Sequence, residues 1–213
     1  MDDASPTSLS GSPHQQVSSR RQINETCLDL LLAEMVTHTF TLYSSSQDSS
    51  GTGGASGSNP SPPSSSSAYP LPSSVLTAHH APDVHPRLEG LGYRVGTALA
   101  ERYTKGRPYM TENLDVIKFI CKDFWIAVFR RQVDNLRTNH RGVYVLQDNT
   151  FRWLSRASTG LGGADAARRA QPFLWFPCGI IRGALANLGV TATVTAETTG
   201  LPQCTFHIKI HKS

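Results

Sequence analysis

The sequence predicts an α+β domain in which four main helices pack on a small antiparallel sheet made of two hairpins. The main reason is the order of the hydrophobic patterns: three helical patterns, a hairpin, a fourth helix and a second hairpin. The strand–helix–strand alternation that builds a parallel sheet does not occur in this order. Length supports the same view. Of the 213 residues, about 150 remain once two polar segments are set aside, enough for one domain with a core but not for a large catalytic barrel.

The two polar segments are residues 1–22 and residues 44–86. Between Ser44 and Ser74, 14 of 31 residues are serine, five are proline and four are glycine. Chains of this composition cannot bury enough apolar surface to offset their conformational entropy. We therefore predict a disordered N-terminal tail at 1–22, followed by a single domain over 23–213. That domain contains a disordered Ser/Pro/Gly-rich insertion at about 44–86.

Residues 25–42 predict the first helix, with Asn24 as a plausible N-cap. Three other apolar residues, Leu30, Val36 and Phe40, fall outside its main apolar stripe, so the helix is apolar over more than half its circumference. One face can pack on its own domain, and the rest needs another cover, which a partner subunit can supply. The stripe consists of Leu28, Leu31, Leu32, Met35 and Leu42.

Residues 88–103 predict a second helix, and Gly92 and Gly96 lie one turn apart on it. A glycine inside a helix costs about 1 kcal/mol relative to alanine, and close approach of another helix backbone is the usual compensation. The fourth helix, Pro172–Leu188, repeats this spacing at Gly179 and Gly183. The apolar ridge of the second helix consists of Leu88, Leu91, Val95 and Leu99.

The third helix is predicted to begin after an N-cap at Thr111 and to run to about Gln132. It is apolar nearly all round, with a narrow polar stripe at Asp115, Lys118 and Lys122, so we expect most of it in the core. The fourth helix should stop at Gly189, a typical C-terminal glycine. Pro177 indicates a kink in that helix or a start at Pro177 itself.

The first hairpin is predicted from Val133–Thr138 and Val143–Gln147, joined through the turn at 139–142. Phe151–Leu154 would extend it, and residues 155–171 are interpreted as a loop of low complexity. The second hairpin joins 191–197 to 203–212 through Thr199–Pro202. In its last strand Cys204, Phe206, Ile208 and Ile210 face the core, because side chains alternate along a strand.

Charge, cysteine spacing and hydropathy argue against several classes of protein. The net charge is +4, but the excess is spread over separated arginine pairs, which favours an ordinary solvated surface over a nucleic-acid-binding face. The four cysteines show no C-x-x-C spacing. The chain opens Met1-Asp2-Asp3 without an apolar leader, and no apolar run approaches the ~18 residues that span a bilayer. We expect a soluble, intracellular protein with reduced thiols.

The residues that carry chemistry form no catalytic constellation, so no catalytic, cofactor or metal site is predicted. Cys178 near a helix start is interpreted first as a buried hydrophobe and only second as a reactive thiol. Cys121 is interpreted as buried. Arg182 predicts an ion pair within the fold or at an interface, with Glu101, Asp115 or Asp123 as partner. A metal at His79, His80 and His85 lacks a fourth ligand.

The arginines of 152–169 are a separate feature. They outnumber the single acid Asp165 and could contact acidic lipid headgroups or an acidic partner. We favour the simpler interpretation, a soluble variable loop.

Five strings, taken in order, are similar to the sixth-subunit family of the transport protein particle (TRAPP) complex, within the Bet-three-like superfamily. The match covers almost all of the residues expected to fold. The strings are Leu31-Leu32-Ala33-Glu34-Met35-Val36, Leu88-Glu89-Gly90-Leu91-Gly92-Tyr93-Arg94-Val95-Gly96, the segment 114–125, the hairpin 136–149, and Cys178-Gly179-Ile180-Ile181-Arg182-Gly183-Ala184-Leu185.

The resemblance implies a Bet-three-like fold and a non-catalytic core subunit of a vesicle-tethering complex. It implies that the assembled complex acts as a Rab guanine-nucleotide exchange factor in ER-to-Golgi and intra-Golgi transport. It also implies a heterodimer with the Bet-three subunit, largely through the first two helices, and a cytoplasmic location, peripheral at Golgi and ER–Golgi membranes. The residues expected at this interface are Leu28, Leu31, Leu32, Met35, Leu91, Val95 and Leu99.

Two departures from the superfamily matter. The Bet-three paralogue carries an acylated cysteine between its second and third helices, whereas here 104–110 contains none, so self-acylation and a lipid tunnel are not carried over. The long insertion is the second departure. The entropic cost of closing a loop grows only logarithmically with loop length, so the insertion costs about 2 kcal/mol more than a loop of about five residues would. Two other functions stay open: a small apolar-ligand or acyl-binding module, and a thiol enzyme at Cys178.

Overall fold

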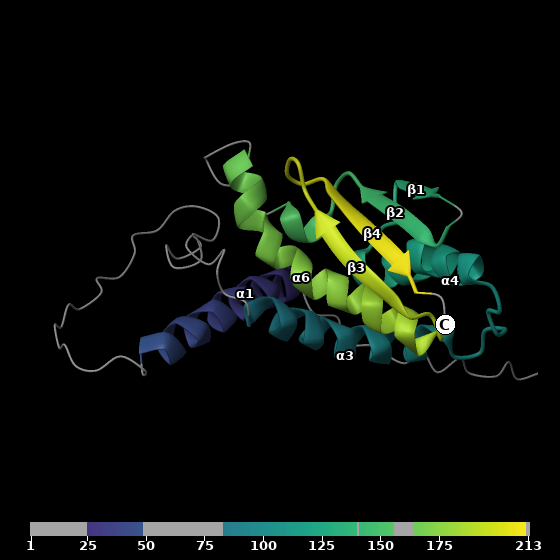
Figure 1. Cartoon of the computed structure of the whole chain (residues 1–213), viewed down its shortest axis with the longest axis horizontal. Coiled ribbons are helices and arrows are strands. Elements are labelled where there is room, and N and C mark those ends of the chain that lie inside the picture. The colour runs from purple at the N-terminus through teal and green to yellow at the C-terminus, as the bar shows by residue number, and fades with distance from the viewer. Residues whose placement is uncertain (1–24, 49–82, 140, 156–163, 212–213) are drawn as a thin grey trace, which may run out of the picture.

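The protein is described by a computed structural model, which covers residues 25–48, 83–139, 141–155 and 164–211 (Figure 1). The long helices are α1 (Glu25–Asp48), α3 (Val84–Thr104) and α6 (Ala164–Asn187). Helix α6 lies against the sheet, and α3 lies on the side of α6 that faces away from the sheet (Figure 1). Helix α1 contacts both α3 and α6. The predicted α+β class, with helices packed on an antiparallel sheet, is confirmed.

The sheet has four antiparallel strands in the order β1-β2-β4-β3. Their bounds are β1 (Asn135–Thr138), β2 (Val143–Asp148), β3 (Ala192–Glu197) and β4 (Cys204–Ile210). The two predicted hairpins are confirmed, and pairing of β2 with β4 joins them, with Leu146 opposite Phe206. Strand β3 alternates strictly between buried and exposed residues, so one face of the sheet is core and the other is not.

Helix α6 differs from prediction at its start. It begins at Ala164, eight residues before Pro172, so the loop predicted at 155–171 is wrong from 164 onward. The segment 164–171 is rich in alanine and arginine, which are strong helix formers, and its composition was mistaken for low complexity. Buried Ala166 and Ala170 hold this first part of the helix, and Gln171 donates a hydrogen bond to the carbonyl of Ala196 in β3 (2.8 Å).

The end of α6 is as predicted. Gly189 has φ +82°, a conformation that only glycine adopts readily. Its N–H bonds the carbonyl of Ala186 (3.1 Å), and the N–H of Val190 bonds the carbonyl of Leu185 (2.9 Å). This pair of bonds is a Schellman motif, which satisfies carbonyls that the helix leaves unpaired.

The third helix is less regular than predicted. It consists of α4 (Asn113–Phe119), a π-helical turn η2 (Ile120–Phe124) and α5 (Trp125–Phe129). Thr111 does not cap it, because the N-cap position is Glu112 and makes no side-chain cap bond. The helix ends three residues early, where Arg130 turns into the left-handed region at φ 65°. Phe151–Leu154 is also wrong as a strand extension, since residues 152–154 form a short 3-10 helix, η3 (Arg152–Leu154).

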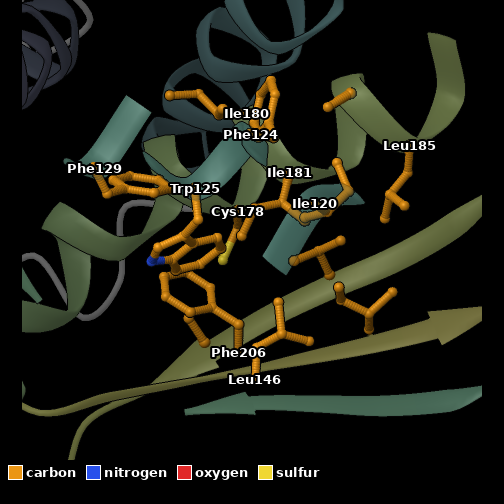
Figure 2. Packing of buried hydrophobic residues seen from close by; sticks show 14 of the residues in the cluster. Ile120, Phe124, Trp125, Phe129, Leu146, Cys178, Ile180, Ile181, Leu185 and Phe206 are labelled. Carbon is orange, nitrogen blue, oxygen red and sulfur yellow. The ribbon is translucent and has the colours of Figure 1, made fainter. Parts of the chain in front are cut away.

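The core lies between the sheet and the helices α6 and α4–α5 (Figure 2). Its centre is aromatic: the ring centroid of Trp125 lies 5.3 Å from the ring centroid of Phe206 and 4.5 Å from that of Phe129. The indole N–H of Trp125 donates to the carboxylate of the fully buried Asp148 (3.0 Å). The third helix is therefore largely core, as predicted, but Leu114 and Ile126 remain exposed.

The N-terminal tail at 1–22 lies outside the described residues. So does most of the insertion at 44–86, and both stay predictions. Helix α1 continues to Asp48 and α3 begins at Val84, so the undescribed part of the insertion is 49–82.

Candidate functional site

Helix α3 meets α6 with almost no side chain between the two backbones. A Cβ placed on Gly92 or Gly96 would overlap the main chain of α6 at Phe176 and Ile180. A Cβ on Gly179 or Gly183 would overlap the main chain of α3 at Glu89 and Tyr93. The prediction that these glycines admit another helix backbone is therefore confirmed in both directions. We call this contact the glycine interlock.

Helix α1 is attached by one face only. Leu32, Val36 and Phe40 are spaced four residues apart and are buried. Val36 and Phe40 form a small cluster with Val84 and Leu88 of α3, to which Tyr43, Phe173 and Trp175 add partly buried contacts. Because the three buried residues share one side of α1, they leave its opposite side without cover from the described chain.

The uncovered surface continues from α1 onto α3. Leu28 is 43% exposed, Leu31 is 63% exposed and Leu42 is 46% exposed on α1, and Val95 of α3 is 40% exposed. We call the surface formed by Leu28, Leu31, Met35, Leu42, Leu91 and Val95 the α1/α3 face. Contiguous exposed apolar surface of this kind marks an interaction site in a folded protein.

The α1/α3 face is hollowed where the two helices part. A groove of 520 Å³ opens between the C-terminal half of α1 and the N-terminal half of α3. Its lining is mostly apolar, and Arg87 and Arg94 line it from the α3 side. The lining residues are Met35, His38, Thr39, Leu42, Pro86, Arg87, Gly90, Leu91 and Arg94.

The seven residues expected at a partner interface fall into three kinds of environment. Leu28, Leu31 and Val95 are exposed on the α1/α3 face. Met35, Leu91 and Leu99 are partly buried and pack against the core from its edge. Leu32 is 8% exposed and belongs to the core of this chain. All seven lie on α1 or α3. Leu28, Leu31 and Val95 are exposed to another protein, and Met35 and Leu91 can be reached through the groove that they line.

Sequence reasoning left the groove and its two arginines out of the expected interface. Leu42 was placed on the apolar stripe of the first helix but was not carried into the interface set, although it lines the groove. Arg87 and Arg94 stand seven residues apart, which is two helical turns on one side of α3. That spacing was visible in the sequence and could have marked them.

The cysteines do not form a nucleophilic site. Cys178 is buried between α6 and the sheet (Figure 2), and burial raises the pKa of its thiol, the opposite of what a reactive thiolate requires. Burial also raises the pKa of Cys204, and it raises that of Cys121 to about 12. The interpretation of Cys178 as a buried hydrophobe is confirmed, whereas Cys121 is only partly buried and packs against the core from its edge. Burial of Cys178 contradicts the hypothesis of a thiol enzyme at this residue.

Arg182 makes the kind of ion pair that was predicted, but with another partner. Its Nε lies 2.8 Å from Oε1 of Glu89 across the glycine interlock, in an orientation that does not make a hydrogen bond. Its guanidinium also lies 4.9 Å from the centre of the Tyr93 ring. Glu101, Asp115 and Asp123 are not its partners. The correct acid is on α3, and sequence alone did not place α3 against α6 in this register.

The remaining candidates give no site among the residues described. No group of three or more His, Cys, Asp or Glu suited to a metal occurs among them. His79 and His80 lie outside these residues, and His85 packs edge-on against Trp175. The region 152–169 is not one loop: it contains η3 and the start of α6, and Arg152 pairs with Asp29 of α1 (3.4 Å). None of the described helices has the length and apolar character to cross a membrane.

Comparison with known proteins gives one consistent relationship. The transport protein particle (TRAPP) component family matches residues 28–211. Over 126 residues the chain is 53% identical to trafficking protein particle complex subunit 6b of Danio rerio, an alignment that covers 59% of this chain and 78% of that protein. The human proteins named subunit 6B and subunit 6A are each 51% identical over 126 residues, covering 59% of this chain and 78% and 77% of theirs.

The fold is shared with solved structures. One of them is a trafficking protein particle complex subunit 3 from Naegleria fowleri, covalently bound to palmitic acid, with a TM-score of 0.53. The alignment covers 66% of this chain and 88% of that one, at 15% sequence identity. At this level of identity the likeness concerns the fold alone.

Proposed function

The chain belongs to the TRAPP component family, in its sixth-subunit group, and we propose that it is a non-catalytic core subunit of a TRAPP vesicle-tethering complex. In this proposal it heterodimerises with the Bet-three subunit. The assembled complex then acts as a Rab guanine-nucleotide exchange factor in ER-to-Golgi and intra-Golgi transport. The subunit would be cytoplasmic and held at Golgi and ER–Golgi membranes through the complex.

The single observation that supports this proposal best is the α1/α3 face. Three leucines of one helix are between 43% and 63% exposed, and they continue onto Val95 and the groove of α3. Leaving so much apolar surface in water is unfavourable, at roughly 25 cal/mol per Å². A protein partner that buries the leucines would remove that cost.

The experiment uses variants of exposed residues, so that loss of binding is not caused by unfolding. Leu31→Arg with Val95→Arg places two charges in the α1/α3 face. We expect this double variant to fold normally and to fail to co-purify with the Bet-three subunit, because a charge buried without a partner is strongly unfavourable. Adding Met35→Arg to Leu31→Arg tests the more buried edge of the same surface.

Leu114→Arg with Ile126→Arg is the matched control. These two side chains, on α4 and α5, are 39% and 41% exposed, close to Val95 in exposure. The control should co-purify like the wild type. If the Leu31 and Val95 double variant still co-purifies, the assignment of the interface to the α1/α3 face is wrong.

A small apolar-ligand module is the second candidate, and only the shared fold favours it. The structure from Naegleria fowleri holds its palmitic acid covalently. Such a bond needs a nucleophilic side chain. Among the residues described here, burial raises the pKa of Cys121, Cys178 and Cys204. Cys27 is exposed on α1. Native mass spectrometry of the purified chain decides this question, because an acyl adduct would add its mass.

A further inference from the structure

Two arginines on the α3 side of the groove have no partner of opposite charge in the described chain. Arg87 and Arg94 are exposed and line the groove two turns apart. Neither makes an ion pair with another described residue. Arg182, Arg131 and Arg152, in contrast, pair with Glu89, Asp134 and Asp29. The two groove arginines are thus available to another molecule.

The groove between α1 and α3 has a lining whose chemistry suits a helix. Its apolar residues include Met35 and Leu42 of α1 and Leu91 of α3. Helix-in-groove recognition places an apolar side chain of the incoming helix against such a lining. Residues seven positions apart on a helix lie on the same side, about 10 Å apart along the axis. Carboxylates with the spacing of Arg87 and Arg94 would therefore flank that apolar side chain.

We propose that the groove receives a helix of the partner subunit that carries an apolar side chain between two carboxylates spaced two turns apart. Arg87 and Arg94 pair with these carboxylates and fix the register of the helix. This inference rests on the proposed heterodimer and names the chemistry of the partner at this point of the interface. Arginine is suited to the task because its guanidinium can bind a carboxylate with two parallel hydrogen bonds.

The same charges argue against a second copy of this chain as the occupant. In a two-fold symmetric dimer the same patch faces itself, so each groove would have to supply the acids that the other needs. The groove lining contains two arginines and a histidine and no carboxylate. Glu89 of α3 pairs with Arg182 of α6, and Glu34 of α1 is exposed but does not line the groove. Like charges facing each other favour the heterodimer over the homodimer.

The test measures the dissociation constant for the purified Bet-three subunit as a function of salt. Arg87→Glu with Arg94→Glu reverses both groove charges. We expect binding roughly tenfold to a hundredfold weaker at low salt, with a smaller salt dependence than that of the wild type. The neutral variant Arg87→Gln with Arg94→Gln should have a dissociation constant between those of the wild type and of the charge-reversal variant. Arg137→Glu with Arg141→Glu is the control: it makes the same change in net charge at exposed arginines of the first hairpin.

The outcomes separate this inference from the proposed function. If the groove variant binds as tightly as its control while Leu31→Arg with Val95→Arg abolishes binding, the inference is overturned and the heterodimer stands. If the wild-type chain does not bind the Bet-three subunit at all, the proposed function itself fails. If the wild-type chain instead forms a homodimer in sedimentation analysis, and Arg87→Glu with Arg94→Glu dissociates it, a second copy occupies the groove and the inference is overturned.

Discussion

The side of α3 that faces α6 and the side that faces α1 are packed in opposite ways. Toward α6, four glycines let the two backbones touch along two turns, with almost no side chain between them. Toward α1, the helices part, a groove opens, and Val95 is left 40% exposed beside leucines that are more exposed still. One side is complete within the chain and the other is not. The contact of α3 with α6 therefore contributes to the stability of the domain, whereas the α1/α3 face gives it the capacity to bind.

The largest effect is expected at the glycine interlock. Gly96→Ala should lower the free energy of unfolding by about 3 kcal/mol, the upper part of the usual range for overpacking. The new Cβ would overlap the main chain of Ile180, which cannot yield unless the two helices separate. Urea denaturation of the purified variant measures the change.

Gly90→Ala is the matched control for this prediction. It is on the same helix, but a Cβ there meets nothing within 4 Å. It should stabilise the protein by about 0.5–1 kcal/mol, because alanine is the better helix former. Equal effects of the two substitutions would show that the interlock does not depend on close backbone contact.

A smaller loss of stability is expected when Asp148, the buried acid of the core, is replaced. Asp148→Ala should destabilise the protein by about 2 kcal/mol, because the indole N–H of Trp125 and the N–H of Thr150 would lose their acceptor. Asp148→Asn keeps an acceptor for one of these two donors, which bond different carboxylate oxygens, and should cost less. If Asp148→Ala proves neutral in urea denaturation, the carboxylate does not hold this part of the core together.

The contribution of Asp148 to stability depends on pH, and the sign of this dependence follows from its pKa. Burial raises the pKa of Asp148 above its ordinary value of 3.8, although bonds from Trp125 and Thr150 and the charge of Arg131 oppose this rise. The folded state therefore binds the proton more tightly than the unfolded state. As pH rises from 3.8 through the raised pKa, stability falls relative to Asp148→Asn, and then stays level. A wild-type stability that decreases relative to that of Asp148→Asn as pH falls toward 3.8 would contradict this account.

The smallest effect is expected at the rim of the interlock. Arg182→Ala removes the ion pair with Glu89 and the contact with Tyr93, but the arginine side chain is 37% exposed, so solvent screens much of the interaction. The loss should be about 1 kcal/mol or less. A double-mutant cycle with Glu89→Ala isolates the pair. A coupling energy several times larger would make this pair a main support of the α3–α6 contact.

How much the sequence predicts differs between these two regions. The spacing of Gly92 with Gly96 and of Gly179 with Gly183 predicts backbone contact, because glycine inside a helix has few other uses. The strand alternation of 191–197 and 203–212 likewise predicts the second hairpin. These patterns are local, and one period is enough to recognise them.

The errors arise where local pattern and tertiary packing disagree. The alanine-rich start of α6 lacks large apolar residues, so periodicity missed it, although Ala166 and Ala170 are buried. The π-helical turn at 120–124 adds a residue to a helix that the apolar pattern predicts as regular. The predicted stripe of α1 contains Leu32 but not Val36 and Phe40, and these three residues together carry the packing. A helix that is apolar on both sides does not reveal which side its own domain covers.

Hydrogen–deuterium exchange of the chain alone and bound to the Bet-three subunit tests the central claim most directly. If the α1/α3 face is the surface completed by the partner, binding should slow exchange along α1 and along the N-terminal half of α3. Exchange in the four strands and in the second half of α6 should not change. Protection that appears instead on the sheet or on α4–α5, with α1 unchanged, would contradict the account.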